Sequence, residues 1–176
     1  VHEAMEHPLI RQYLEKLTEE EIIPEVPPVP NTVLENYRLL IDKRFANPKI
    51  GDTIRRLCLD GSNRQPKFIL PTVSDRLAKG RSITGLALVS ALWCRYCYGT
   101  TDSGAVIEPK DPSWDRLLKQ ASLAKDEPAR WLEMTDIFGA LATNPAYIDA
   151  FSAALKRIWQ DGTAQTLERY LADQPL

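Results

Sequence analysis

The sequence has few of the residues from which catalytic centres are commonly built. Only two of its 176 residues are histidines, His2 and His7, and no cluster of acidic or cysteine ligands lies near them. It contains no glycine-rich phosphate loop, no GxGxxG turn and no GxSxG nucleophile elbow. We therefore expect that this chain holds no general base of its own and that any such base lies elsewhere in a longer protein.

The sequence also lacks a strong charge of either sign and a long hydrophobic run. Its formal net charge of -2 implies no bulk attraction to nucleic acid or to a membrane surface. The longest apolar stretch, residues 83–93, is too short to cross a bilayer and includes Ser90. No stretch resembles a signal peptide, so we expect neither a nucleic-acid nor a membrane partner.

Cysteine is scarce as well. The three cysteines, Cys58, Cys94 and Cys97, lie in apolar helical patterns, which is typical of buried thiols in a reducing compartment and predicts a cytoplasmic location. Cys94 and Cys97 have CxxC spacing, but they lie within one predicted helix and have no second ligand pair. We therefore expect no metal.

The residues that are present follow a helical period along most of the chain. The strongest prediction is a helix over residues 83–98, apolar nearly all round, as a central core helix would be. A second helix is predicted over residues 32–46, capped by Asn31 or Thr32. Four prolines within residues 24–30 predict an extended connector. Because no stretch alternates as a strand would, residues 1–176 are predicted to form one all-α domain of about nine to eleven helices, many of them short.

The most irregular stretch is the segment 47–68, which carries five basic and two acidic side chains around Asp60-Gly61-Ser62. We expect a short helix, a stop at Gly61 and a second helix start. Its apolar side chains, Ile50, Ile54, Leu57, Cys58 and Phe68, are expected to point inward, and Asp52 is expected to pair with Arg55 or Arg56.

Arg56 and Arg64 flank this turn. A guanidinium offers a planar fork of donors that binds hydroxyl, carbonyl or carboxylate oxygens and keeps its proton. Two such forks, with Asp60, Ser62 and Asn63 as supporting partners, would suit a polyhydroxylated small molecule. The alternative is that the arginines only form surface ion pairs with nearby acidic residues.

The order of residues in this segment resembles a known family. Asn47-Pro48-x-Ile50-x-Asp52-Thr53-x-Arg55-Arg56, followed by Asp60-Gly61-Ser62-x-Arg64-x-Pro66-Lys67-Phe68, is similar to the C-terminal domain of the long-chain polyol dehydrogenases. That group includes the mannitol 2-dehydrogenases and the related fructuronate reductases. The motifs His7-Pro8-Leu9-Ile10-Arg11, Pro27-x-Val29-Pro30 and Arg44-Phe45-x-Asn47-Pro48, together with the final pair of helices around Gly162, extend the resemblance along the chain.

The resemblance implies that residues 1–176 are the substrate-binding domain of a two-domain enzyme, with a fold like the C-terminal domain of 6-phosphogluconate dehydrogenase-like enzymes. The missing N-terminal domain would be of Rossmann type and would bind NAD or NADP. The catalytic lysine, asparagine and histidine of the family are expected upstream of Val1, which would leave this fragment inactive by itself. Two substrate contacts of the family fall on Arg56 and Arg64.

The resemblance leaves the substrate open between a sugar alcohol, oxidised to a ketose, and a hexuronate of the fructuronate/mannonate type. The second family contact is commonly lysine in mannitol-type members, so Arg64 is a departure, and two guanidiniums would suit a sugar acid. A non-catalytic helical interaction domain, with the arginine turn as a docking patch for an acidic partner, is the alternative from another class.

Overall fold

The computed structural model describes residues 2–51 and 53–176 and is built from helices. The α-helices of the first half are α1 (His2–Glu6), α2 (Pro8–Leu17), α3 (Leu34–Phe45), α4 (Ile54–Leu57), α5 (Gly61–Arg64) and α6 (Leu70–Ala78). Those of the second half are α7 (Thr84–Cys97), α8 (Trp114–Ala124), α9 (Ala129–Leu132), α10 (Thr135–Phe138), α11 (Pro145–Asp161) and α12 (Thr163–Leu171). Five short 3-10 or π segments complete them: η1 (Thr18–Ile22), η2 (Ile23–Glu25), η3 (Pro48–Ile50), η4 (Gln65–Ile69) and η5 (Gly139–Thr143).

The prediction of an all-α domain is confirmed. Across residues 2–51 and 53–176, the only β pairing is one isolated bridge between Thr100 and Val106. Among the helices described, none combines the length and the apolar character needed to span a bilayer.

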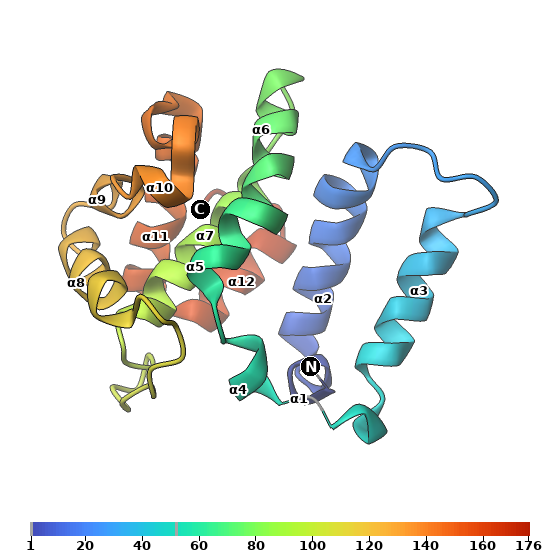
Figure 1. Ribbon diagram of the computed structural model, residues 1–176, viewed down its shortest axis with the longest axis horizontal. Helices are drawn as coiled ribbons and strands as arrows, with labels where there is room; N and C mark the ends of the chain where they lie inside the picture. The colour runs from blue at the N-terminus through green and yellow to red at the C-terminus, as the bar shows by residue number, and fades with distance from the viewer. Residues whose placement is uncertain (1, 52) are drawn as a thin grey trace.

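Helix α7 lies at the centre of the domain, as its apolar sequence predicts (Figure 1). It packs most extensively against α11 and also against α8. Its polar Ser90 is fully buried and accepts a hydrogen bond of 2.8 Å from Tyr147 Oη of α11, which satisfies both hydroxyls inside the core. On the other side, Tyr13 Oη of α2 donates to the Gly85 carbonyl over 2.9 Å. These contacts join α2, α7 and α11 into one core.

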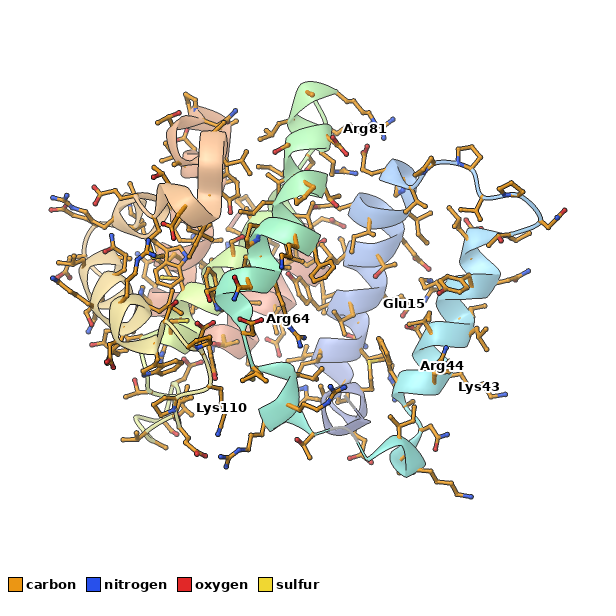
Figure 2. The ribbon with its side chains drawn as sticks, viewed as in Figure 1. Glu15, Lys43, Arg44, Arg64, Arg81 and Lys110 are labelled. Atoms are coloured by element: carbon orange, nitrogen blue, oxygen red, sulfur yellow. The ribbon has the colours of Figure 1, made fainter. Side chains whose placement is uncertain are left out.

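Helix α3 stands outside this core, on the outer side of α2 (Figure 1). It contains no buried residue, although its sequence predicts a wide apolar face. Its best-buried polar side chain is Arg38, whose guanidinium lies 2.7 Å from Glu19 of η1 and 3.6 Å from Glu15 of α2. Glu15 is labelled in Figure 2. The predicted cap was wrong: Val33 precedes the helix, while Thr32 Oγ1 donates to the Pro30 carbonyl instead.

The start of α7 is capped by a side chain from another element. Glu21 of η1, only 3% exposed, accepts hydrogen bonds from the backbone N–H groups of Gly85 (2.7 Å) and Leu86 (2.9 Å). The first amides of a helix have no partner within it, and its N-terminus attracts negative charge. The Glu21 carboxylate therefore anchors α7 to the α2–η1 segment.

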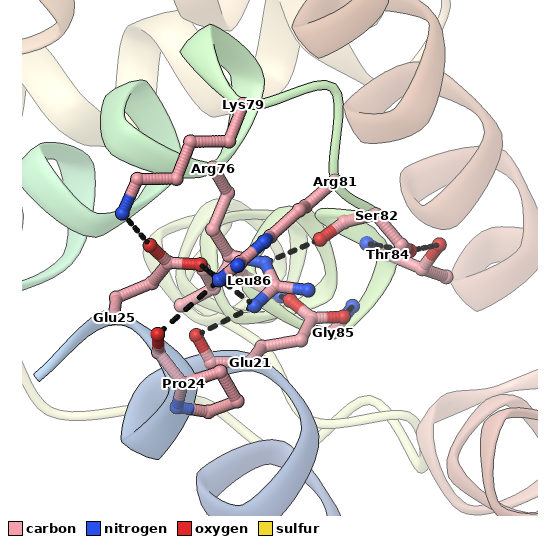
Figure 3. A network of polar contacts seen from close by, with 10 residues as sticks. All are labelled: Glu21, Pro24, Glu25, Arg76, Lys79, Arg81, Ser82, Thr84, Gly85 and Leu86. Carbon is pink, nitrogen blue, oxygen red and sulfur yellow. Dashed lines mark hydrogen bonds and ion pairs between the residues drawn. The ribbon is translucent and has the colours of Figure 1, made fainter.

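A second carboxylate gathers the cations around this anchor (Figure 3). Glu25 lies 3.2 Å from Arg76 Nη1, 2.8 Å from Arg81 Nη1 and 2.7 Å from Lys79 Nζ. Arg76, itself buried, also donates to the carbonyl oxygens of Glu21 and Ser82. The network therefore binds the C-terminal end of α6, and the residues that follow it, to η1 and η2.

We predict that Glu21→Gln lowers the free energy of unfolding at neutral pH by about 1–3 kcal/mol, because one buried backbone N–H loses its acceptor. Chemical denaturation of the protein and its variant measures the difference. The control for loss of a surface charge is Asp75→Asn, at an exposed aspartate of α6. Equal unfolding curves for Glu21→Gln and the unsubstituted protein would contradict the anchoring role.

The same pair of proteins tests the titration of Glu21. Burial raises the pKa of its carboxyl, and the N–H donors of Gly85 and Leu86, with Arg76, only partly oppose the shift. Between the unfolded and the raised folded pKa, the folded state binds more protons, so the contribution of Glu21 falls as pH rises. The stability of the unsubstituted protein relative to Glu21→Gln should therefore decrease between about pH 4 and pH 7. A difference that grows over this range would contradict the raised pKa.

Candidate functional site

The two arginines singled out in the sequence lie on either side of a turn between α4 and α5. Thr53 Oγ1 accepts a hydrogen bond of 3.2 Å from the Arg56 N–H and so caps the single turn of α4. Arg64 ends α5, and α5, η4 and α6 follow one another without a break in the helical chain. Both arginines are exposed (Figure 2 labels Arg64). A ligand can therefore reach both side chains from solvent.

Asp60 makes the turn. Its backbone adopts a left-handed conformation (φ 67°), and its side chain accepts a hydrogen bond of 2.5 Å from Asn63 Nδ2. The Arg64 N–H donates to the Asp60 carbonyl over 3.2 Å, which closes the first turn of α5. The expected stop at Gly61 was wrong, because α4 ends at Leu57 and Gly61 begins α5. The left-handed residue of the turn is Asp60, and aspartate tolerates this backbone conformation.

Gly61 is needed for a different reason. A Cβ atom at this position would lie 2.5 Å from Nε1 of Trp93 in α7. The indole cannot easily move away, because its ring packs edge-on against Trp131 with centroids 4.9 Å apart. The absence of a side chain at Gly61 lets the turn lie directly on α7.

Ser62, predicted as a ligand partner, is buried and engaged within the protein. Asp111 accepts hydrogen bonds from both the backbone N–H (2.7 Å) and the Oγ (2.8 Å) of Ser62. Asp111 also accepts from the Ser113 N–H over 2.9 Å. The sequence shows the local turn at Asp111-Pro112-Ser113, but nothing in it indicates a partner 49 residues away. Asp60, Ser62 and Asn63 thus shape the turn that carries the two arginines.

Arg55, the neighbour of Arg56, forms an ion pair at the surface. Its guanidinium makes two hydrogen bonds of 2.7 Å to the carboxylate of Glu108. Lys110 and Arg55 lower the pKa of Glu108, so the pair stays ionised over a wide pH range. The surface-pair alternative is therefore right for Arg55. The predicted partner Asp52 lies outside the described residues.

Most of the apolar side chains of this segment are not inward, contrary to expectation, although Cys58 is half-buried. Phe68 is 70% exposed, and Ile50, Ile54 and Leu57 are exposed as well. Leu59, beside the turn, is also exposed. Helical spacing identifies an apolar face but does not say whether the domain's own core or another surface covers it. The arginines therefore lie in an apolar rim formed by the segment 50–68.

An open, mainly apolar cavity lies away from this turn, between α2 and α3. It measures about 610 Å³ and is lined mainly by apolar side chains such as Leu14, Ile22, Tyr37, Ile41 and Phe45. Its lining comes from α2, α3 and the proline-rich connector and does not include Arg56 or Arg64. Arg56 and Arg64 therefore lie on an exposed surface of this chain and outside this cavity.

Comparison with known proteins identifies the fold. The family model of the mannitol dehydrogenase C-terminal domain matches residues 1–159. A mannitol 2-dehydrogenase of Cereibacter sphaeroides is 57% identical over 98% of this chain, and one of Aspergillus clavatus is 32% identical over 97%. These alignments cover 36% and 34% of the two relatives, so the chain spans about a third of their length.

Two solved structures share the architecture. Mannitol 2-dehydrogenase of Pseudomonas fluorescens, in a ternary complex with NAD and D-mannitol, matches with a TM-score of 0.91 at 31% identity. The match covers 97% of this chain and 35% of that one. A substrate-free D-sorbitol dehydrogenase matches with a TM-score of 0.74 at 20% identity, over 94% of this chain and 34% of its own, and supports the fold alone.

We predict that Gly61→Ala destabilises the protein by about 1–3 kcal/mol, because the added methyl group collides with the Trp93 indole. Alanine is the better helix former by about 1 kcal/mol, so a stabilised variant would contradict the close approach. Thermal unfolding of Gly61→Ala, Trp93→Phe and the double variant forms a mutant cycle. Because the smaller ring removes Nε1, the two changes should be less than additive.

Proposed function

Because the chain belongs to the mannitol dehydrogenase C-terminal domain family, we propose that it is the substrate-binding part of an NAD(P)-dependent polyol dehydrogenase. The intact enzyme would interconvert a sugar alcohol of the mannitol type and the corresponding ketose. The observation that carries the proposal is the match over nearly the whole chain to a mannitol 2-dehydrogenase in complex with NAD and D-mannitol. A location in the cytoplasm belongs to the same proposal and is favoured by the three free thiols.

The two arginines would contact the substrate. Both are exposed, both belong to the turn that lies on α7, and each carries a fork of donors that matches adjacent hydroxyl oxygens. Arg56 and Arg64 approach from the two ends of the turn, which favours a ligand with several oxygens over one with a single polar group. Their task is to bind and orient, since an arginine keeps its proton at all working pH values.

The cofactor would be held by the rest of the protein. The residues described here form no βαβ unit, and the chain has no dinucleotide glycine turn, so they do not fit a dinucleotide site. Nicotinamide supplies the hydride acceptor or donor when it is bound there. The preference between NAD and NADP therefore resides outside this chain, although the NAD of the Pseudomonas fluorescens complex favours NAD.

The apolar rim supports an N-terminal domain as the partner. Ile54, Leu57 and Phe68 expose large side chains beside Arg56 and Arg64, where a purely solvent-facing helix would carry polar ones. The relatives are almost three times as long as this chain, so they contain a further domain able to cover such a surface. A domain seated there would close the arginine turn into a cleft and exclude water from the substrate.

The other candidate functions have less support. Arg64, in place of the lysine expected from the family resemblance, is the one feature that favours a hexuronate substrate. The curated relatives described above are mannitol 2-dehydrogenases, and the first is 57% identical, which favours the polyol. A free-standing interaction domain does not explain the resemblance along the whole chain to these enzymes.

We predict that Arg56→Ala and Arg64→Ala in the full-length enzyme each lower kcat/KM for mannitol by about 10- to 100-fold, the loss expected for one charge-assisted hydrogen bond. Steady-state kinetics with mannitol, arabinitol and fructuronate measure the effect. Arg116→Ala is the matched control, because Arg116 is an exposed arginine of α8 paired with Asp136. Unchanged kinetics in the Arg56 variant would return that residue to a surface role.

We also predict that the 176-residue chain alone shows no turnover of these substrates with NAD or NADP. Its folding is checked by circular dichroism, which should give a strongly helical spectrum. Turnover above background by the isolated, purified chain would overturn the assignment of the catalytic groups to the remainder of the enzyme.

A further inference from the structure

The helical run that starts with α5 begins without a cap of its own. Asp60, which precedes it, has a left-handed backbone, and its side chain binds Asn63 instead of the first helical amides. The helix continues through η4 and α6 as far as Ala78. A run of this length has free N–H groups and a positive dipole at its start, and both need a partner.

Asp111 supplies that partner from the loop that follows α7. Its Oδ2 accepts from the Ser62 N–H at 2.7 Å, and its Oδ1 accepts from Ser62 Oγ at 2.8 Å and from the Ser113 N–H at 2.9 Å. Asp111 and Ser62 are each only 8% exposed. Both carboxylate oxygens thus accept hydrogen bonds from protein donors within a buried environment.

The same loop grips the turn at two more points. The Asp60 N–H donates to the Lys110 carbonyl over 3.3 Å, and Glu108 binds Arg55. The Glu108 pair is exposed on both sides and screened by solvent, so it constrains α4 weakly. The Asp111 bonds are buried and charge-assisted, so they dominate the fixing of the turn.

Two titratable side chains, Tyr96 and Cys97, lie near Asp111. Burial, with a smaller contribution from the charge of Asp111, raises the pKa of the Cys97 thiol, and burial likewise raises the pKa of Tyr96. Both neighbours therefore stay neutral and protonated at physiological pH. The negative charge of Asp111 interacts favourably with the positive end of the helix dipole at the start of α5.

We propose that Asp111 is a positioning residue for substrate binding, whose carboxylate fixes the start of α5 so that Arg56 and Arg64 hold their places at the substrate. This proposal rests on the proposed function of the arginine turn. Ser62 lies two residues before Arg64 and within one turn of the cap, so a shift of its amide moves the Arg64 side chain directly. Gly61 lies directly against Trp93, so the position of the turn also limits where α4 can lie.

The test compares Asp111→Asn and Ser62→Ala with a matched control in the full-length enzyme. Asp102→Asn is that control, because Asp102 lies in the same loop and its Oδ2 accepts from the Thr163 N–H at 2.7 Å at the start of α12. Asp102→Asn therefore removes the negative charge from the same kind of cap, at a helix that carries neither arginine. Ser62→Thr, which retains the hydroxyl and the amide, is the conservative variant.

Asp111→Asn should raise KM for mannitol by about 10-fold or more, with a smaller change in kcat, because a misaligned turn weakens binding before it affects chemistry. Ser62→Ala should raise KM by a few-fold, and Ser62→Thr should restore it. Asp102→Asn should lower Tm while KM stays at the value of the unsubstituted enzyme. Hydrogen–deuterium exchange in the peptide holding Ser62 and Asn63 should accelerate in Asp111→Asn and, to a smaller extent, in Ser62→Ala, and should stay unchanged in Asp102→Asn.

Other results would overturn the proposal. If Asp111→Asn does not fold, the kinetics and exchange of Ser62→Ala test the proposal in its place. An unchanged KM together with unchanged exchange in Ser62→Ala would reject the positioning role of Asp111. Equal KM changes in Asp111→Asn and Asp102→Asn reduce Asp111 to a stabilising residue. If the unsubstituted enzyme turns over no polyol, the proposed function fails and the substrate role of Asp111 fails with it. Exchange at Ser62 still reports whether Asp111 holds the turn, so the two failures are distinguishable.

Discussion

The hydrogen bonds that the Glu21 carboxylate accepts from the first amides of α7 are the interaction on which the rest of the domain depends. Helix α7 passes through the centre of the molecule, so its first amides cannot be satisfied by water. Glu21 brings a carboxylate to them from the α2–η1 segment, and the positive charge of Arg76, which also pairs with Glu25, lies beside it (Figure 3). Once α7 is fixed at this end, α11 packs along it and α12 closes over α2.

The same device recurs at two other helix starts. Asp102 accepts from the first amide of α12, and Asp111 accepts from the second residue of α5. Both carboxylates come from the loop between α7 and α8, which therefore ties two distant helices to the core helix. For Asp102, burial would raise the pKa, but the hydrogen bonds from Thr163 and the charge of Arg95 outweigh it and lower the pKa. This loop, which is rich in glycine, aspartate and proline, thus fixes the starts of α5 and α12.

The fold and the site differ in how the two are stabilised. The core is apolar and closed, whereas the turn with Arg56 and Arg64 lies on an open face among exposed apolar side chains. Such a surface is costly in water by itself and becomes favourable when another domain covers it. This arrangement suits an enzyme in which one domain presents the substrate contacts and another holds the cofactor, because closure then assembles the site and dries it in one step.

Local pattern in the sequence was enough to predict the helical architecture, the central position of α7 and the place of the arginine turn between two short helices. These features depend on residues three or four apart, which a helix brings together without help from the rest of the chain. The buried side of the 50–68 segment was predicted wrongly, since Ile54 and Phe68 are exposed on this chain.

Only the tertiary structure decided which groups hold the helix starts. Glu21 reaches Gly85 across 64 residues, Asp102 reaches Thr163 across 61, and Asp111 reaches Ser62 across 49. No periodicity relates such positions, because a carboxylate cap requires only that an oxygen arrive within hydrogen-bond distance of a free amide. The sequence by itself determined that arginines would stand at this turn, and the packing of a distant loop determined how firmly they are held.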